Sequence, residues 1–133
     1  MNGFKMKLYV DTNILLQDLI DHPDSGAVAW ESFRFQSQGH TLVSSVLTAV
    51  EIDRVLLRHG GSRTQITATL LRGFDLLAIT PAVIDLARVI PVQFLKTLDS
   101  LHLATAVISR CDAVITMDQQ FARACEDIGL AVA

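Results

Sequence analysis

The chain of 133 residues has the length of a single domain that can bury a substantial hydrophobic core. Half of the residues are apolar and the mean hydropathy is +0.39, yet no apolar run approaches the ~20 residues needed to span a bilayer. The formal net charge of −3 disfavours a protein whose whole surface binds nucleic acid. If four acids gathered in one metal site, however, the rest of the chain would be close to neutral.

The N-terminus lacks the basic region, apolar stretch and cleavage site of a signal peptide. Cys111 and Cys125 are the only cysteines, and neither stands in a metal-binding spacing. We therefore expect a cytoplasmic protein with reduced cysteines in its core and no membrane segment. The apolar excess predicts a buried sheet or an interface with a partner.

Apolar periodicity and capping residues define the expected elements. In chain order they are strand 8–10, helix 14–20, helix 24–39, strand 41–43, helix 44–59, a helix opened by a capping box of Ser62 and Gln65, strand 76–79, helix 81–89, helix 96–109, strand 113–115, helix 118–128 and strand 130–132. Along helix 96–109 the spacing predicts one side formed by Leu98, Leu101, Thr105 and Ile108.

Short apolar strands that alternate with helices predict a parallel sheet covered by helices on both faces. The expected fold class is therefore α/β, a three-layer α/β/α domain with a mostly parallel sheet of about five short strands. Residues 1–133 are expected to form one domain, since no internal repeat, linker or low-complexity segment divides the sequence.

Four acidic residues stand in places that an amphipathic pattern alone does not explain. Asp11 and Asp118 each follow a strand, which puts them at the carboxyl edge of the sheet, where open α/β proteins bind ligands. Glu51 lies mid-helix among apolar neighbours four residues away on either side. Asp99 lies near the start of helix 96–109, which can lean over the same edge.

Each acid also has an ordinary structural explanation. The two acids that follow strands can cap the helices that begin there, and Asp99 is favoured by a helix dipole. Glu51 can form a salt bridge with Arg54 or Arg58. Taken together, four converging carboxylates repel one another unless a divalent cation holds them, and an all-oxygen set favours Mg²⁺ or Mn²⁺ over zinc. Such ions promote hydrolysis of phosphodiester bonds.

Four motifs in this order resemble those of a PIN-domain ribonuclease, in particular the VapC-type toxins of toxin–antitoxin pairs. They are YVDTNILL, SVLTAVEIDRVL, LDSLHLATA and ITMDQQF, and they span nearly the whole chain. The resemblance implies a Mg²⁺- or Mn²⁺-dependent endoribonuclease that cleaves RNA, is inhibited by a cognate antitoxin and forms a homodimer. Its acidic catalytic and metal site corresponds to Asp11, Glu51, Asp99 and Asp118, with Asp11 and Asp99 as direct ligands.

The resemblance further implies that Asn13 and Thr116 orient the acids or the attacking water. Family members differ in whether the last acid touches the metal, which leaves direct ligation by Asp118 open. Basic residues near the acids are candidates for holding RNA phosphates or for pairing with the acids themselves, namely Arg54, Arg58 and Lys96. His102, three residues after Asp99, is expected to be a packed core residue outside the site.

Two other classes of protein are compatible with parts of this pattern. A phospho-acceptor receiver domain would need paired acids after the first strand and a lysine after the last, and both are missing. A catalytically silent PIN-like module that binds RNA or protein remains an alternative. The RNA cleaved, the antitoxin, the number of metal ions and the choice between dimer and higher oligomer stay open. Apolar residues expected at an interface are Trp30, Phe33, Phe35, Leu56 and Leu57.

Overall fold

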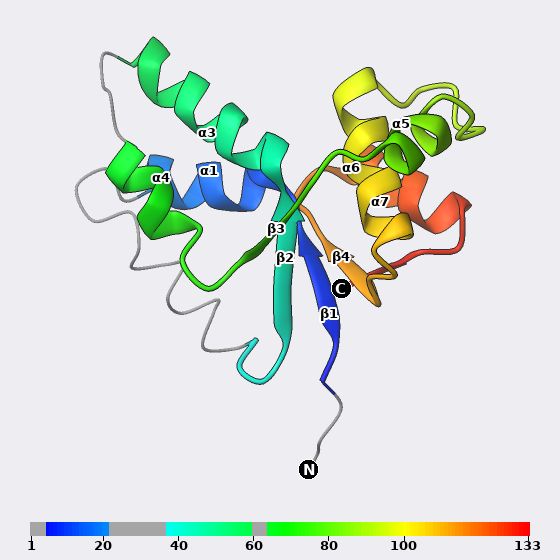
Figure 1. Ribbon diagram of the computed structural model, residues 1–133, viewed down its shortest axis with the longest axis horizontal. Helices are drawn as coiled ribbons and strands as arrows, with labels where there is room; N and C mark the ends of the chain where they lie inside the picture. Colours follow the sequence, from blue (N-terminus) through cyan, green and yellow to red (C-terminus); the bar gives the residue numbers. More distant parts are fainter. Residues whose placement is uncertain (1–4, 22–36, 60–63) are drawn as a thin grey trace.

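A central strand, β1 (Lys7–Val10), organises the molecule, shown in Figure 1 as a computed structural model that describes residues 5–21, 37–59 and 64–133. The sheet has five strands in the order β3-β2-β1-β4-β5, and every neighbouring pair is parallel. The other strands are β2 (Thr41–Ser45), β3 (Asp75–Leu77), β4 (Ala113–Ile115) and β5 (Ala131–Val132). The strand order reverses between β1 and β4, so this junction is the topological switch point where α/β sheets bind ligands.

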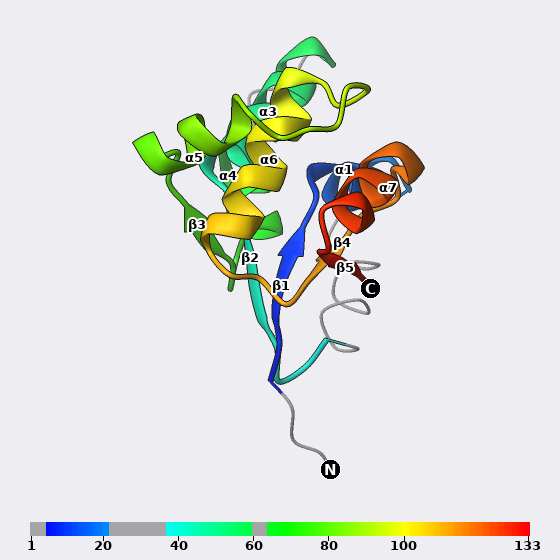
Figure 2. The ribbon, with the colours of Figure 1, turned by 90° about the vertical axis from the view of Figure 1, so that its right-hand side faces the viewer.

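Helices cover both faces of the sheet and make three layers, as expected for the α/β/α class (Figure 1). One face carries α1 (Thr12–Asp21), α3 (Val46–Arg58) and α4 (Thr64–Leu70). The other face carries α5 (Pro81–Ala87), α6 (Thr97–Ile108) and α7 (Gln119–Asp127). Figure 2 shows α5 alongside α6, and α7 next to β4 and β5.

The period of two along the strands divides the core between the two faces. Tyr9 and Val114 point into the cluster under α6 and α7, together with Leu103 and Phe121. The intervening strand residues point into the cluster under α1, α3 and α4, among them Leu8, Val10, Leu42 and Ala113. Because both faces of the sheet are buried, a central strand can be apolar at every position, as β1 is at residues 8–10.

Most of the expected elements are confirmed to within a few residues, and strand 113–115 matches at both ends. The first helix begins at Thr12, two residues earlier than expected, because Asp11 already stands at its N-terminus. Ser45 accepts from Leu47 N–H and caps α3, as the serine pair predicted. The expected helix 24–39 and the Ser62–Gln65 capping box fall mainly outside the described residues, as do Trp30, Phe33 and Phe35.

The predicted apolar side of α6 is confirmed at Thr105, which is buried, and is wrong at Leu98 and Ile108. Leu98 and Ile108 are 48% and 43% exposed, whereas residues 102–106 are all buried. The helix is covered on two sides, by the sheet and by α5, which lies alongside it (Figure 2), so more than one narrow stripe of α6 is buried.

The two cysteines, Cys111 and Cys125, are both buried and form no disulfide, in agreement with the sequence prediction. Burial raises the pKa of both thiols, to about 11 for Cys111 and about 12 for Cys125, so they stay protonated at neutral pH. Within the described ranges no helix combines the length and the apolar character that crossing a bilayer requires.

Candidate active site

Asp11 stands at the switch point, immediately after β1 and at the N-terminus of α1. Its backbone N–H donates to the Ile115 carbonyl at 2.9 Å, which ties it to the end of β4. Its Oδ1 accepts from Thr12 N–H at 2.8 Å, and its Oδ2 accepts from the Thr116 hydroxyl at 2.8 Å. The residue is only 8% exposed, so these donors hold the carboxylate in one orientation.

Asn13 and Thr116 lock the loop after β4 to the start of α1. The Asn13 amide donates to Thr116 Oγ1 at 3.3 Å and accepts from Met117 N–H at 3.2 Å. The Thr116 hydroxyl oxygen also accepts from Asp118 N–H at 3.0 Å. Thr116 therefore bonds directly to Asp11, and Asn13 bonds to Thr116. These positions are compatible with the orienting role that the resemblance implies for both residues.

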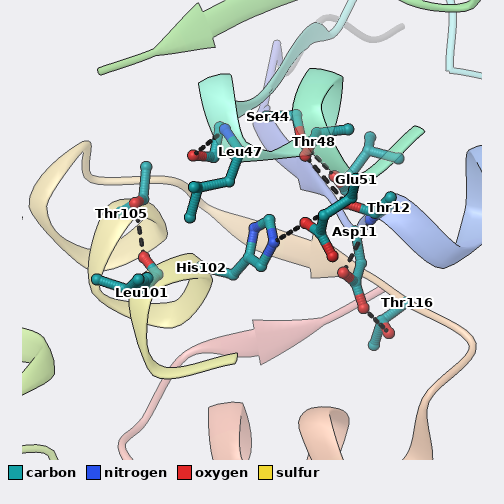
Figure 3. Close-up of polar contacts among 12 residues, drawn as sticks. Asp11, Thr12, Ser44, Leu47, Thr48, Glu51, Leu101, His102, Thr105 and Thr116 are labelled. Atoms are coloured by element: carbon teal, nitrogen blue, oxygen red, sulfur yellow. Dashed lines mark hydrogen bonds and ion pairs between the residues drawn. The ribbon is translucent and has the colours of Figure 1, made fainter. Parts of the chain in front are cut away.

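Glu51 lies in the middle of α3, and its side chain is 29% exposed. Its Oε1 accepts from the Thr12 hydroxyl at 3.0 Å and lies 2.6 Å from His102 Nε2. Figure 3 shows its carboxyl group facing that of Asp11. In the described part of the chain no salt bridge joins it to Arg54 or Arg58, both exposed, so the ion pair considered from sequence spacing is not formed.

Asp99 lies in the first turn of α6 and Asp118 is the N-cap of α7. The Asp118 Oδ1 accepts from Gln120 N–H at 2.9 Å and from Phe121 N–H at 3.1 Å, so one of its oxygens has an ordinary capping role. The N-cap of α6 is Lys96, whose side chain makes no capping hydrogen bond. Asp99 is half-buried, and the positive charge of Lys96 partly offsets the rise in its pKa that burial causes.

The four acids share one electrostatic environment. Burial is the main cause that raises the pKa of Asp11 and of Asp99 above their ordinary value. The negative charges of Asp118 and Glu51 raise the pKa of Asp99 further, and Asp99 does the same to Asp11. Mutual repulsion, which the sequence predicts, is therefore present but contributes less than burial.

His102, which sequence reasoning left outside the site, is in direct contact with it. Its ring is buried, with Nδ1 2.5 Å from the Tyr9 hydroxyl and Nε2 2.6 Å from the Glu51 carboxylate. Three buried hydroxyls extend the network, those of Thr12, Thr48 and Ser44 (Figure 3). The sequence offers one indication, a histidine in the mainly apolar segment LHLATA. A histidine that only packs in the core gives the same pattern, so this indication does not distinguish the two roles.

The donor set suits a hard divalent cation, since the facing groups are carboxylates. Among the residues that the structure describes, no group of three or more acidic, histidine or cysteine side chains is close enough to enclose a metal ion. Mg²⁺ does not need such a cage, because it keeps several waters and binds proteins through one or two carboxylates. The facing carboxylates of Asp11 and Glu51 (Figure 3) fit that mode of binding.

The fold and site define an α/β protein with two facing carboxylates at the switch point of a parallel sheet. The model of the PIN domain family matches residues 8–127. The chain is 33% identical to Ribonuclease VapC47 and 32% identical to Ribonuclease VapC46, both of Mycobacterium tuberculosis, and covers 95% of each protein. This chain therefore belongs to the PIN domain family, and the resemblance to VapC-type members is confirmed.

Solved structures have the same fold. The chain superimposes on VapBC2 from Rickettsia felis, bound to a promoter DNA fragment, with a TM-score of 0.70 at 15% identity, over 96% of this chain and 98% of that one. A toxin–antitoxin complex from Klebsiella pneumoniae gives a TM-score of 0.66 at 22% identity, covering 95% and 96% of the two chains.

Proposed function

We propose that this chain is a metal-dependent endoribonuclease of the VapC type, the toxin of a toxin–antitoxin module. It would hydrolyse RNA phosphodiester bonds at Asp11, Glu51, Asp99 and Asp118. The observation that carries the proposal is the pair of facing carboxylates, Asp11 and Glu51, at the switch point (Figure 3). The identity of about one third to ribonucleases VapC47 and VapC46 over nearly the whole chain supports RNA as the substrate.

The resemblance implies Asp11 and Asp99 as direct ligands of Mg²⁺ or Mn²⁺, and the facing carboxylates of Asp11 and Glu51 (Figure 3) favour Glu51 as a ligand beside Asp11. The charge of Asp118 adds to the negative charge around Asp99. Such an ion lowers the pKa of bound water and stabilises the negative charge that develops on a phosphate during hydrolysis. The raised pKa of Asp11 and Asp99 supports cation binding here, because a cation relieves the unfavourable burial of their negative charge.

The remaining polar residues of the site hold the acids and the substrate. Thr116, itself held by Asn13, keeps the Asp11 carboxylate in place by donating to its Oδ2. Lys96 lies near Asp99 and is exposed, so it can bind an RNA phosphate beside the acids. Arg54 is exposed one turn after Glu51 and is free of the salt bridge considered above, which also suits a phosphate contact.

Two protein partners follow from the same assignment: a cognate antitoxin and a second copy of this chain. A partner of the first kind is supported by the Klebsiella pneumoniae toxin–antitoxin complex, which has a similar fold. Homodimerisation is supported by exposed apolar side chains on α3, namely Val46, Val50 and Leu57. Leu56, also expected at an interface, is partly buried against the chain's own core.

The buried thiols of Cys111 and Cys125 suit a cytoplasmic location, where cysteines stay reduced.

The direct test is cleavage of a structured RNA by the purified protein in millimolar Mg²⁺ or Mn²⁺. We expect EDTA to abolish cleavage, and Asp11→Asn to lower the rate at least ~100-fold, because the central carboxylate is lost while the side-chain shape is kept. Asp85→Asn is the matched control, since Asp85 is an exposed acid on α5, away from the site, that forms an ion pair with Arg88.

The control variant should cleave at the wild-type rate, and both variants should keep the wild-type far-ultraviolet circular dichroism. Undiminished cleavage in EDTA, or by Asp11→Asn, would contradict the proposed mechanism. A wild-type protein that binds RNA but does not cut it under any metal condition would favour the catalytically silent module.

A further inference from the structure

A buried chain of hydrogen bonds crosses the core and ends on one oxygen of the site. Tyr9 comes from β1, His102 from α6 and Glu51 from α3. Tyr9 is 0% exposed and His102 is 1% exposed, so neither side chain relies on bulk water for a partner. These hydrogen bonds therefore join three separate elements. Each element carries or directly precedes an acid of the site: β1 precedes Asp11, α3 carries Glu51 and α6 carries Asp99.

The partners determine which nitrogen of His102 carries the proton. A carboxylate can only accept, so Nε2 is the donor to Glu51 Oε1. When the ring is neutral, Nδ1 is the acceptor, and the Tyr9 hydroxyl, 2.5 Å away, donates to it. Burial raises the pKa of Tyr9 far above its ordinary value, so this hydroxyl keeps its proton under all ordinary conditions.

Glu51 Oε1 thus receives two donors, His102 Nε2–H at 2.6 Å and the Thr12 hydroxyl at 3.0 Å. Both converge on the same oxygen, which restricts rotation of the carboxyl group and presents the other oxygen toward Asp11 (Figure 3). His102 lies in the buried segment 102–106 of α6, and replacing a buried polar pair by apolar side chains of similar volume is often neutral or stabilising. The arrangement of His102 is understandable if its task is to orient Glu51.

We propose that His102, oriented by Tyr9, is a positioning residue that holds the Glu51 carboxylate in the geometry required to bind a divalent cation next to Asp11. This inference rests on the proposed function. It assigns His102 and Tyr9 no contact with RNA or with the reacting atoms. Loss of the Nε2 donor should therefore weaken cation binding and turnover without changing the affinity for RNA.

Two substitutions at one position separate the two contacts of the ring. In His102→Gln the side-chain amide nitrogen reaches the place of Nε2 and can still donate to Glu51. In His102→Asn the shorter amide reaches only the place of Nδ1, so it keeps the Tyr9 contact and loses the donor to Glu51. Tyr9→Phe removes a single oxygen and leaves the packing of β1 intact. Glu51→Gln serves as the reference for loss of the carboxylate.

The first measurement is Mn²⁺ binding to the metal-free proteins by calorimetry and by electron paramagnetic resonance of free Mn²⁺. For His102→Asn we expect the dissociation constant to rise ~10–100-fold, as when a partner that orients a metal ligand is removed. His102→Gln should stay within about threefold of the wild type, and Tyr9→Phe should lie in between. In RNA cleavage kcat should fall in the same order while the KM for RNA stays unchanged.

Equal Mn²⁺ affinity in wild type and His102→Asn would overturn the proposal. So would an equal loss in His102→Gln and His102→Asn, since that pattern reports only a disturbed core. If both variants at position 102 fail to fold, Tyr9→Phe becomes the test of the proposal. A wild-type Mn²⁺ affinity of Tyr9→Phe would then show that the hydrogen bonds from Tyr9 through His102 do not orient Glu51. A wild type that binds Mn²⁺ but does not cleave RNA would reject the nuclease assignment alone, and a wild type that binds no Mn²⁺ would overturn both.

Discussion

Asp99 shows how a single residue of the site affects stability. Its pKa is raised mainly by burial and then by the negative charges of Asp118 and Glu51. The folded state therefore binds more protons than the unfolded chain above pH ~4, the ordinary range of an aspartate. Stability falls as the pH rises from there to the folded pKa, and the loss persists at every higher pH.

Removing this charge should stabilise the metal-free protein. We expect Asp99→Asn to raise the free energy of unfolding at pH 7 by up to about 1 kcal/mol, a modest value because the half-exposed carboxylate is screened by water. The difference should shrink toward zero as the pH approaches 3, where the wild-type carboxyl is protonated in both states. Thermal melts across this pH range in EDTA measure the effect.

Mg²⁺ should reverse the order of the two proteins. Millimolar Mg²⁺ should stabilise the wild type more than Asp99→Asn, because the complete set of acids binds the cation more tightly in the folded state. A metal-free variant that melts below the wild type, together with equal responses to Mg²⁺, would mean that the four acids do not act as one site.

At the scale of elements, α6 and α7 end in the same backbone motif with different residues at the key position. After α6, Arg110 has φ 57, and Cys111 N–H donates to the Ala106 carbonyl at 3.0 Å. After α7, Gly129 occupies the equivalent position with φ 85. Both are Schellman endings, which need the left-handed conformation that glycine adopts without strain.

We therefore expect Arg110→Gly to raise the free energy of unfolding by about 0.5–1 kcal/mol, because the strain of ~1–2 kcal/mol is only partly offset by glycine's larger chain entropy. Gly129→Ala is the reciprocal control and should lower stability by a similar amount. A Cβ there would meet no atom within 4 Å, so conformation alone is changed. Urea denaturation measures both. A destabilised Arg110→Gly protein would show that the arginine side chain contributes more than its backbone strain.

At the scale of the whole molecule, exposed apolar residues mark the surface that we assign to a second copy of the chain. Val46, Val50 and Leu57 are 40%, 55% and 53% exposed and lie four and seven residues apart along α3, which places them on one side of the helix. Exposed apolar side chains gathered on one helix face are typical of an interface.

The double substitution Val50→Asp and Leu57→Asp should weaken the homodimer at least ~10-fold, since charged groups at the centre of an apolar interface must be desolvated. Light scattering and sedimentation at micromolar concentrations measure the dissociation constant. Val89→Asp, at an exposed apolar residue beyond α5, is the control and should leave it unchanged. A wild type that is monomeric over the same range would contradict the homodimer.

A feature could be predicted from the sequence when it depends on residues that are close together along the chain. The alternating elements, the three layers and the placement of Asp11 and Asp118 at strand ends follow from short-range periodicity, and the structure bears the fold out. The packed face of α6 was only partly predicted, because it depends on the packing of α5 against the same helix, which helical periodicity does not show. Only the three-dimensional contacts show that Leu56, a candidate interface residue, packs partly against the chain's own core.

The sequence by itself determined the order of strands and helices and which acids stand next to them, because capping, turn chemistry and hydrophobic period act within a few residues. Only the tertiary structure decided what these acids contact. His102 lies 51 residues from Glu51 and 93 from Tyr9, so no spacing rule links them. Glu51 meets histidine and threonine in place of the nearby arginines, because the parallel sheet brings β1, α3 and α6 together at its switch point.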